Sequence, residues 1–282
     1  MTRYRRTKAQ IAQLREQILE VLRADHPQSV RHIFYRMTDP RLPEPVPKTD
    51  KGYGVVQRQL VQMRREEVVP YHWITDSTRR GYFVETYSGV RNFLEDVATL
   101  YRRDIWRRAD TYVEVWCESR SIAGVLMEET ERYRVPLYPS GGFTSLSLAH
   151  QAAGFMAADA GGRPIRVLYI GDYDPAGLLI NDHIERELRE HLPSGVDLTV
   201  DRLAVTREQI DLMGLPAKPT KDRRARWEGG CVEAEAIHAA TLRAILRNAI
   251  EEHIDQRELE VVLAAEKSER EGILAMAEGW ER

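Results

Sequence analysis

Hydrophobic residues recur at helical spacing in the first part of the chain and in short unbroken runs in the second. Residues 7–23 carry an apolar residue at every third or fourth position, which predicts an amphipathic helix. Two further helices are predicted over 29–37, where Ser29 is the expected N-cap, and over 53–66. Residues 68–84 are rich in Val, Tyr, Trp and Ile around a polar centre, which predicts a β-hairpin.

From residue 111 onward, apolar runs alternate with helical patterns. The strands are predicted over 111–117, 135–138, 165–170 and within 196–205, and the helices over 121–133, 144–158 and 175–190, with a short helix from Thr206. A helix over 90–108 links this part to the first, and a helical region over 232–278 follows it. This alternation predicts an α/β fold with a doubly wound, mainly parallel sheet.

The predicted elements divide the chain into four parts. They are an N-terminal domain (1–88), a linking helix (89–110), the α/β domain (111–215), and a loop with C-terminal helices (216–282). Three helices followed by a hairpin predict a winged helix, a helix-turn-helix variant whose third helix enters the major groove of DNA. A three-helix domain without a DNA partner is the alternative.

Charge is divided unevenly along the 282 residues, although the net charge is only −3. Residues 1–110 hold 21 Lys and Arg against 14 Asp and Glu, whereas the remainder holds 20 against 30. A basic first part favours double-stranded DNA as a partner. The candidate DNA-binding residues lie just before the third helix, on it, and at the hairpin tip: Lys51, Arg58, Arg64, Arg65, Arg79 and Arg80.

The apolar content of 43% occurs without any stretch long enough to span a membrane, and the first residues lack the apolar segment of a signal peptide. Cys117 and Cys231 are far apart and suggest no disulfide framework. We therefore expect a cytoplasmic, nucleoid-associated protein without a membrane partner.

The apolar run 167–170 ends at Gly171 and is followed by Asp172, Asp174 and Pro175. This order predicts a buried parallel strand, a tight turn and a helix with Asp174 as its N-cap and Pro175 at its first position. Both carboxylates would then leave the carboxyl end of a strand, where open α/β sheets place their sites. A helix cap with a loop carboxylate, and a divalent-metal site, are the two interpretations.

Glu118 ends the first predicted strand of the same sheet. Three carboxylates at one sheet edge suit Mg²⁺, which takes few protein ligands and keeps waters or substrate phosphates as the others. Glu118, Asp172 and Asp174 are therefore the candidate metal ligands. Glu114 is the rival to Glu118 but lies in mid-strand, four residues earlier.

A Glu at the end of the first strand and Asp-x-Asp after a later one resemble the Toprim domain of topoisomerases and primases. The stretch Asp172-Tyr-Asp-Pro-Ala-Gly177 is similar to that of the type IIB topoisomerase VI A subunit and the meiotic double-strand-break transesterases. Those proteins place a winged helix before Toprim, with a catalytic Tyr in an Arg-x-x-Tyr-Tyr pattern. Arg31-His-Ile-Phe-Tyr35 matches it, so the resemblance implies that Tyr35 is the nucleophile and Arg31 its assisting residue.

The resemblance implies Mg²⁺-dependent DNA cleavage through a 5′-phosphotyrosyl link, in a homodimer that assembles each active centre from two protomers. The family commonly has Lys after the first-strand Glu, whereas Ser119 and Arg120 stand here. The chain contains no Gly-rich ATPase signature, so ATP-driven strand passage would need a separate B-like subunit. The length is closer to that of the short, stand-alone A-like proteins of bacteria and mobile elements.

Two other functions remain open. One is a Toprim-type hydrolytic nuclease of plasmid or phage defence, in which water replaces Tyr35 as the nucleophile. The other is a non-catalytic DNA-binding protein whose carboxylates are structural or inactive. The alternative role for Tyr35 itself is that of a core aromatic residue in a short helix. Glu233 and Glu235 form a further acidic pair. Either one of them approaches the metal, or they form a solvated or capping helix start, and they are not assigned as ligands.

Overall fold

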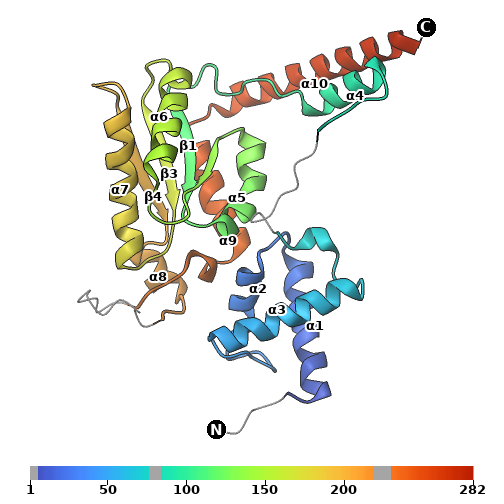
Figure 1. Ribbon diagram of the computed structural model, residues 1–282, viewed down its shortest axis with the longest axis vertical. Helices are drawn as coiled ribbons and strands as arrows, with labels where there is room; N and C mark the ends of the chain where they lie inside the picture. Colours follow the sequence, from blue (N-terminus) through green and yellow to red (C-terminus); the bar gives the residue numbers. More distant parts are fainter. Residues whose placement is uncertain (1–5, 76–83, 219–229, 282) are drawn as a thin grey trace.

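The N-terminal unit of the computed structural model consists of three packed helices (Figure 1). The structure describes residues 6–75, 84–218 and 230–281. The helices are α1 (Lys8–Ala24), α2 (Val30–Met37) and α3 (Asp50–Arg65). Thr7, Ser29 and Thr49 cap them by accepting a backbone N–H. The three predicted helices and the Ser29 cap are confirmed.

The predicted hairpin over 68–84 is not formed by its described residues. A short 3₁₀ helix, η1 (Tyr71–Trp73), follows Pro70, and Ile74 makes an isolated parallel bridge with Gln28. The Trp73 ring stacks on His26 at 4.4 Å, so this segment is attached to the end of α1 instead of pairing with a second strand. The predicted hairpin tip, with Arg79 and Arg80, lies outside the described residues.

The predicted linking helix over 90–108 is also shorter in the structure. Helix α4 (Val90–Leu100) ends where the following backbone binds α10 (Gln256–Glu278). Arg270 donates to the Tyr101 carbonyl oxygen, and the Arg103 N–H donates to Glu266 at 2.7 Å. These contacts replace the next helical turn, and α4 and α10 form an arm beside the sheet domain (Figure 1).

In the described residues, four parallel strands form the sheet in the order β2-β1-β3-β4. They are β1 (Tyr112–Cys117), β2 (Leu137–Pro139), β3 (Ile165–Ile170) and β4 (Leu198–Ala204). The chain leaves β1 for β2 on one side and then crosses to β3 and β4 on the other. The order therefore reverses between the two central strands, which is where open α/β sheets bind ligands.

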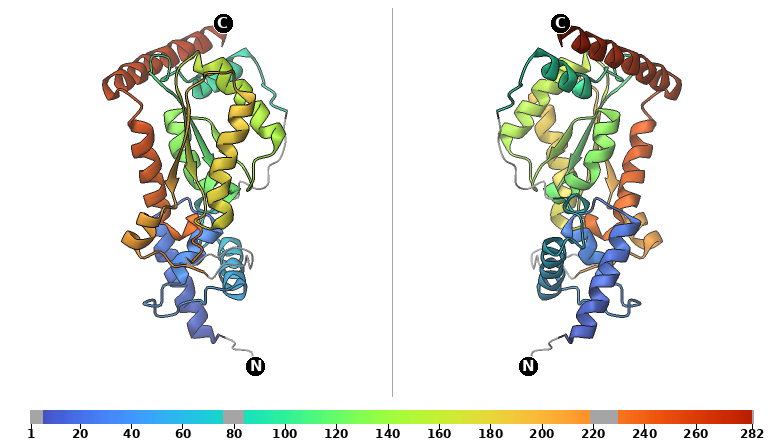
Figure 2. Two further views of the ribbon diagram at one scale, coloured as in Figure 1. Left: turned by 90° about the vertical axis from the view of Figure 1, so that its left-hand side faces the viewer. Right: turned by 90° about the vertical axis from the view of Figure 1, so that its right-hand side faces the viewer.

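Helices cover both faces of the sheet, as the alternation predicts (Figures 1 and 2). Helices α5 (Arg120–Tyr133) and α9 (Ala239–Glu251) pack on one face, and α6 (Leu146–Ala160) and α7 (Pro175–His191) on the other. Side chains of β1 alternate between the two cores, with Val115 in the first and Trp116 in the second. The α/β class with a parallel sheet is confirmed.

The C-terminal region returns to the carboxyl edge of the sheet before it forms the arm. Helix α8 (Arg207–Met213) follows β4, and the 3₁₀ helix η2 (Ala234–Ala236) precedes α9. A final turn, η3 (Gly279–Glu281), follows α10. Arg36 of α2 donates to the Ala236 carbonyl oxygen at 2.7 Å, so η2 lies between the N-terminal unit and the sheet. No helix in the described ranges has the length and apolarity to cross a membrane.

Candidate functional site

Glu118 and Asp172 meet at the carboxyl edge of the two central strands. The Asp172 N–H donates to Glu118 Oε2 at 2.9 Å, because β1 and β3 pair in register up to Cys117 and Ile170. Asp172 Oδ1 in turn accepts the N–H of Ala234 in η2 at 2.9 Å. The sheet order therefore brings two of the three predicted metal ligands together.

Asp174 caps α7, as the sequence predicts. Its Oδ1 accepts the Gly177 N–H at 2.6 Å, and Pro175 occupies the first helical position. A Cβ atom at Gly177 would lie 2.2 Å from the Asp172 carbonyl oxygen, so this turn has no space for a side chain there. The cap engages one carboxylate oxygen and leaves the second as the donor that a cation would take.

The carboxylates at this edge destabilise one another. Burial is the main cause that raises the pKa of Asp172 to about 8, and the charges of Glu118 and Glu235 add to it. Burial also raises the pKa of Glu118, against the opposing effects of the Asp172 N–H and of Arg202. A hard cation would relieve this repulsion and suits the oxygen donors. In the part of the chain that the structure describes, however, no three acidic, His or Cys side chains form a ready ligand set.

Arg202 of β4 holds the turn between β3 and α7. Its guanidinium donates to the carbonyl oxygens of Gly171, Asp172 and Gly177 at 3.1, 3.2 and 2.6 Å. It also lies 5.1 Å from the centre of the Tyr169 ring. No sequence signal indicates this role, because a single arginine in a predicted strand carries no motif.

Glu114, the rival to Glu118, lies inside the core rather than at the edge. It is fully buried and accepts hydrogen bonds from Tyr112 Oη at 2.8 Å and Trp116 Nε1 at 2.9 Å. Burial raises its pKa to about 7 in spite of these two donors. The structure therefore places Glu118 alone of the two at the edge.

Tyr35 reaches this edge from α2. Its ring is only 4% exposed and packs on Phe34, but its hydroxyl donates to Glu233 Oε2 at 2.6 Å. Arg31 Nη1 donates to the same oxygen at 2.9 Å, and Lys218 Nζ donates to Glu233 Oε1 at 2.6 Å. The side chain is therefore a core aromatic whose hydroxyl enters a charged site.

Glu233 occupies the N-cap position of η2, but its carboxylate forms ion pairs with Arg31 and Lys218 and neither caps the helix nor is left to solvent. Its three donors lower the pKa of the Glu233 carboxyl to about 2, although burial acts in the opposite direction. Burial and Glu233 together raise the pKa of the Tyr35 hydroxyl. In this arrangement Tyr35 is a protonated hydrogen-bond donor.

Two lysines lie against the Tyr35 ring. Lys48 Nζ and Lys218 Nζ are 4.9 and 5.3 Å from the ring centre. Burial and the charge of Lys218 lower the pKa of Lys48 to about 8. No sequence motif marks either lysine, and only the docking of two distant segments brings them together.

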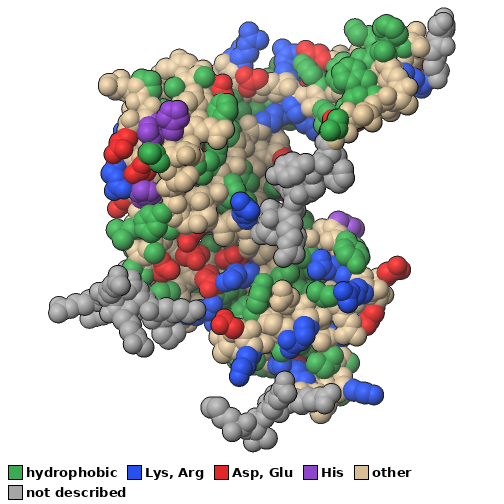
Figure 3. Space-filling view, in the orientation of Figure 1, with side chains coloured by type: hydrophobic (Ala, Val, Ile, Leu, Met, Phe, Trp, Pro, Cys, Tyr) green, Lys and Arg blue, Asp and Glu red, His purple; other side chains and the backbone are tan. Residues whose placement is uncertain are grey.

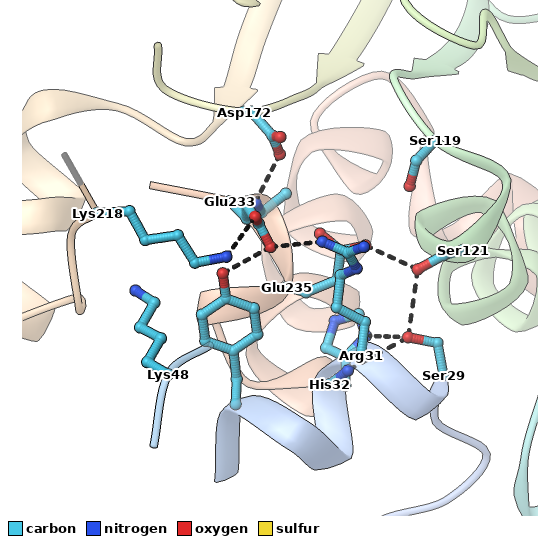
Figure 4. A network of polar contacts seen from close by, with 12 residues as sticks. Ser29, Arg31, His32, Lys48, Ser119, Ser121, Asp172, Lys218, Glu233 and Glu235 are labelled. Carbon is cyan, nitrogen blue, oxygen red and sulfur yellow. Dashed lines mark hydrogen bonds and ion pairs between the residues drawn. The ribbon is translucent and has the colours of Figure 1, made fainter. Parts of the chain in front are cut away.

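Glu235, the second acid of the pair, connects the site to the N-terminal unit. It is buried, and Ser121 Oγ donates to it at 2.7 Å (Figure 4). Ser121 Oγ also lies 3.2 Å from Ser29 Oγ, which is 2.9 Å from His32 Nδ1. Burial lowers the pKa of His32 to about 3. The network joins α2, α5 and η2.

The predicted DNA-binding residues on α3 form an exposed stripe. Lys51, Arg58 and Arg65 are exposed at intervals of seven residues, which is two helical turns. Arg64 is partly covered and lies 5.5 Å from the centre of the Tyr71 ring. Basic side chains are spread over this unit, and acidic ones gather on the sheet domain above it (Figure 3).

Comparison with known proteins identifies no relative. No family model, no curated protein and no solved structure matches the chain. The function must therefore be inferred from the site itself.

Proposed function

We propose that the chain is a Mg²⁺-dependent DNA-cleaving transesterase, similar to the A subunit of type IIB topoisomerases. One observation carries the proposal: a tyrosine hydroxyl, an arginine and the acidic sheet edge meet in one site. Tyr35 and Arg31 donate to Glu233, and the next residue, Ala234, donates its N–H to Asp172.

The proposed reaction exchanges one phosphodiester for another. The Tyr35 hydroxyl oxygen bonds to a backbone phosphorus, and the bond from that phosphorus to the 3′ oxygen breaks. The phenolic proton is lost to solvent, and the released 3′ oxygen takes up a proton, so the step needs no co-reactant. Arg31 stabilises the charge on the phosphoryl oxygens, as a guanidinium does for phosphate.

Glu118, Asp172 and Asp174 would hold Mg²⁺ at the sheet edge. When bound, the ion would neutralise the acidic edge and the phosphate charge beside it. The support is the oxygen-only donor set and the raised pKa of Asp172, which burial causes first and the charges of Glu118 and Glu235 increase. In the described part of the chain, hydrogen bonds to backbone N–H groups already orient one oxygen of each carboxylate.

The proposed partner is double-stranded DNA, bound along the stripe of α3 that carries Lys51, Arg58 and Arg65. The resemblance implies a centre assembled from two protomers, whereas here Tyr35 and the acidic edge lie together within one chain. A homodimer remains part of the proposal because a double-strand break needs two such centres. A B-like ATPase subunit would be needed only for strand passage.

A hydrolytic nuclease is the second candidate, and one observation favours it. The pKa of the Tyr35 hydroxyl is raised by burial and by Glu233, which makes it a poor nucleophile in this arrangement. Water would then attack the phosphorus, and both DNA ends would be free of protein.

The test uses supercoiled DNA and Mg²⁺ with wild type and Tyr35→Phe. The transesterase predicts protein-linked 5′ ends that disappear in Tyr35→Phe, while the control Tyr101→Phe, which removes a hydroxyl bonded to Glu269 on the arm, retains them. Cleavage by Tyr35→Phe at the wild-type rate would instead establish the nuclease. Either enzyme requires that Asp172→Ala lose Mg²⁺-dependent cleavage. DNA binding without cleavage by wild type or any variant would support the non-catalytic DNA-binding function.

A further inference from the structure

Three cations from separate segments surround Tyr35. Arg31 lies on α2, Lys48 precedes α3, and Lys218 follows α8 and forms a backbone bridge with Cys231. Figure 4 shows Arg31 on one side of Glu233 and Lys218 on the other, with Lys48 below Lys218. Such a concentration of cations around one hydroxyl fits an anionic ligand.

The Glu233 carboxylate occupies the centre of this group. It accepts from Tyr35 Oη at 2.6 Å, from Arg31 Nη1 at 2.9 Å and from Lys218 Nζ at 2.6 Å. A phosphodiester also presents two anionic oxygens, and it must touch the tyrosine hydroxyl and the arginine if Tyr35 is to attack it. The carboxylate therefore stands where the phosphate of a cleavable DNA would stand.

A cavity large enough for a phosphate group lies among these three cations. A cavity of about 310 Å³ is lined by Arg31, Lys48 and Lys218, with Asp50 as its acidic member. One water molecule accounts for about 30 Å³ of liquid. Two of the lining residues, Lys48 and Lys218, also lie against the Tyr35 ring, so an anion in this cavity would be within reach of all three cations.

We propose that Arg31, Lys48 and Lys218 form a phosphodiester-binding site beside Tyr35, which the Glu233 carboxylate closes until a DNA phosphate replaces it. The inference rests on the proposed function, because it takes DNA as the source of the phosphate. It also explains the state of Tyr35 in this structure. The hydroxyl donates to Glu233 in this arrangement and would face three cations once that carboxylate has turned away.

Only the side chain of Glu233 has to move. The backbone on either side is fixed, since Val232 pairs with Tyr173 and the Ala234 N–H binds Asp172. The side chain is 21% exposed, so a rotation places the carboxylate in solvent. The bond from the Ala234 N–H to Asp172 also connects Glu233 to the acidic edge of the sheet.

The experiment measures the affinity for a short DNA duplex by fluorescence anisotropy, with EDTA present so that no metal-dependent cleavage occurs. Glu233→Gln keeps the shape of the side chain and removes its charge. We expect about tenfold tighter binding and a salt dependence that is steeper by about one counterion, since a cation is freed for phosphate. Adding Lys218→Met to Glu233→Gln should reverse both changes.

Two further variants test whether a change in DNA affinity comes from overall charge or from altered folding. Glu271→Gln makes the same charge change at an exposed position of α10, at the far end of the molecule, and should bind DNA like wild type. Lys48→Met removes none of the three donors to Glu233, although it loses the bond from Lys48 Nζ to the Pro216 carbonyl oxygen, and it should weaken binding about fivefold through the loss of one phosphate contact. All variants are compared after their thermal unfolding has been measured.

Equal affinity of Glu233→Gln and wild type would overturn the inference, as would the absence of DNA binding in both. The outcome is separable from that of the proposed function. Tighter binding by Glu233→Gln without any protein-linked DNA in wild type supports the phosphate site and removes the transesterase. Protein-linked DNA in wild type with unchanged affinity in Glu233→Gln removes only the phosphate site.

Discussion

The buried imidazole of His32 should make the fold sensitive to acid. His32 is 1% exposed, and Ser29 Oγ lies 2.9 Å from its Nδ1. Its Nε2 is buried without a hydrogen-bond partner among the described residues. Burial is the main cause that lowers its pKa to about 3, and the charges that act on it come from Arg36, Arg243 and His238.

Protonation of His32 lowers the free energy of unfolding as the pH falls, because the folded protein binds this proton more weakly than the unfolded chain does. An ordinary His has a pKa of about 6.5, so the unfolded chain takes up the proton first as the pH falls. The contribution of His32 to stability is therefore complete above pH 6.5 and is lost progressively between pH 6.5 and 3. With the pKa at about 3 in the folded protein, the loss is about 2 kcal/mol at pH 5 and about 5 kcal/mol below pH 3.

The assay is urea denaturation at pH 8 and pH 5. His32→Asn keeps a polar group near Ser29 but cannot titrate, so it should be less stable than wild type at pH 8 because of the lost volume. Between the two pH values, wild type should lose about 2 kcal/mol more of its unfolding free energy than His32→Asn does. The control His72→Asn replaces an exposed imidazole of the same unit and should follow wild type. An equal loss in wild type and His32→Asn would refute the reasoning.

Two further predictions concern the turn that carries the acidic edge. Gly177→Ala should lower Mg²⁺-dependent cleavage about 100-fold, because its Cβ would lie 2.2 Å from the Asp172 carbonyl oxygen and would displace that residue. The control Gly154→Ala, where a Cβ meets no atom within 4 Å, should retain activity and gain about 0.5–1 kcal/mol of helix stability. Asp174→Ala should lose about 1 kcal/mol of unfolding free energy with the cap, and Asp174→Ser should recover the stability but not the cleavage. Recovery of cleavage in Asp174→Ser would remove Asp174 from the metal ligands.

The elements that the sequence predicts correctly depend on residues close together in the chain. The apolar run before Gly171, the Asp174 cap and Pro175 define a strand, a turn and a helix within about ten residues, and the structure contains them. Glu118 and Asp172 could be placed at one edge because strands joined by helices run parallel and end on the same side. These conclusions need no knowledge of what packs on the sheet.

The two segments that the sequence misassigned are determined by distant contacts. Residues 68–75 have the composition of a strand. The Trp73 ring instead stacks on His26, which attaches this segment to the end of α1. The helical pattern of 90–108 continues past Leu100. Side chains of α10 instead form hydrogen bonds with the Tyr101 carbonyl oxygen and the Arg103 N–H, so the helix ends there. Tertiary contacts override local secondary-structure propensity where a distant residue satisfies the backbone hydrogen-bonding groups equally well.

The charged site around Tyr35 was determined by the tertiary structure alone. The sequence marked Arg31 and Tyr35 as a motif and set Glu233 apart as an unassigned acid, 198 residues from Tyr35. Nothing local specifies that η2 lies between α2 and the sheet edge, where Glu233 meets both side chains and Lys218. The order of the strands and the docking of the N-terminal unit set that contact, since the energy of an ion pair depends on distance in space and not along the chain.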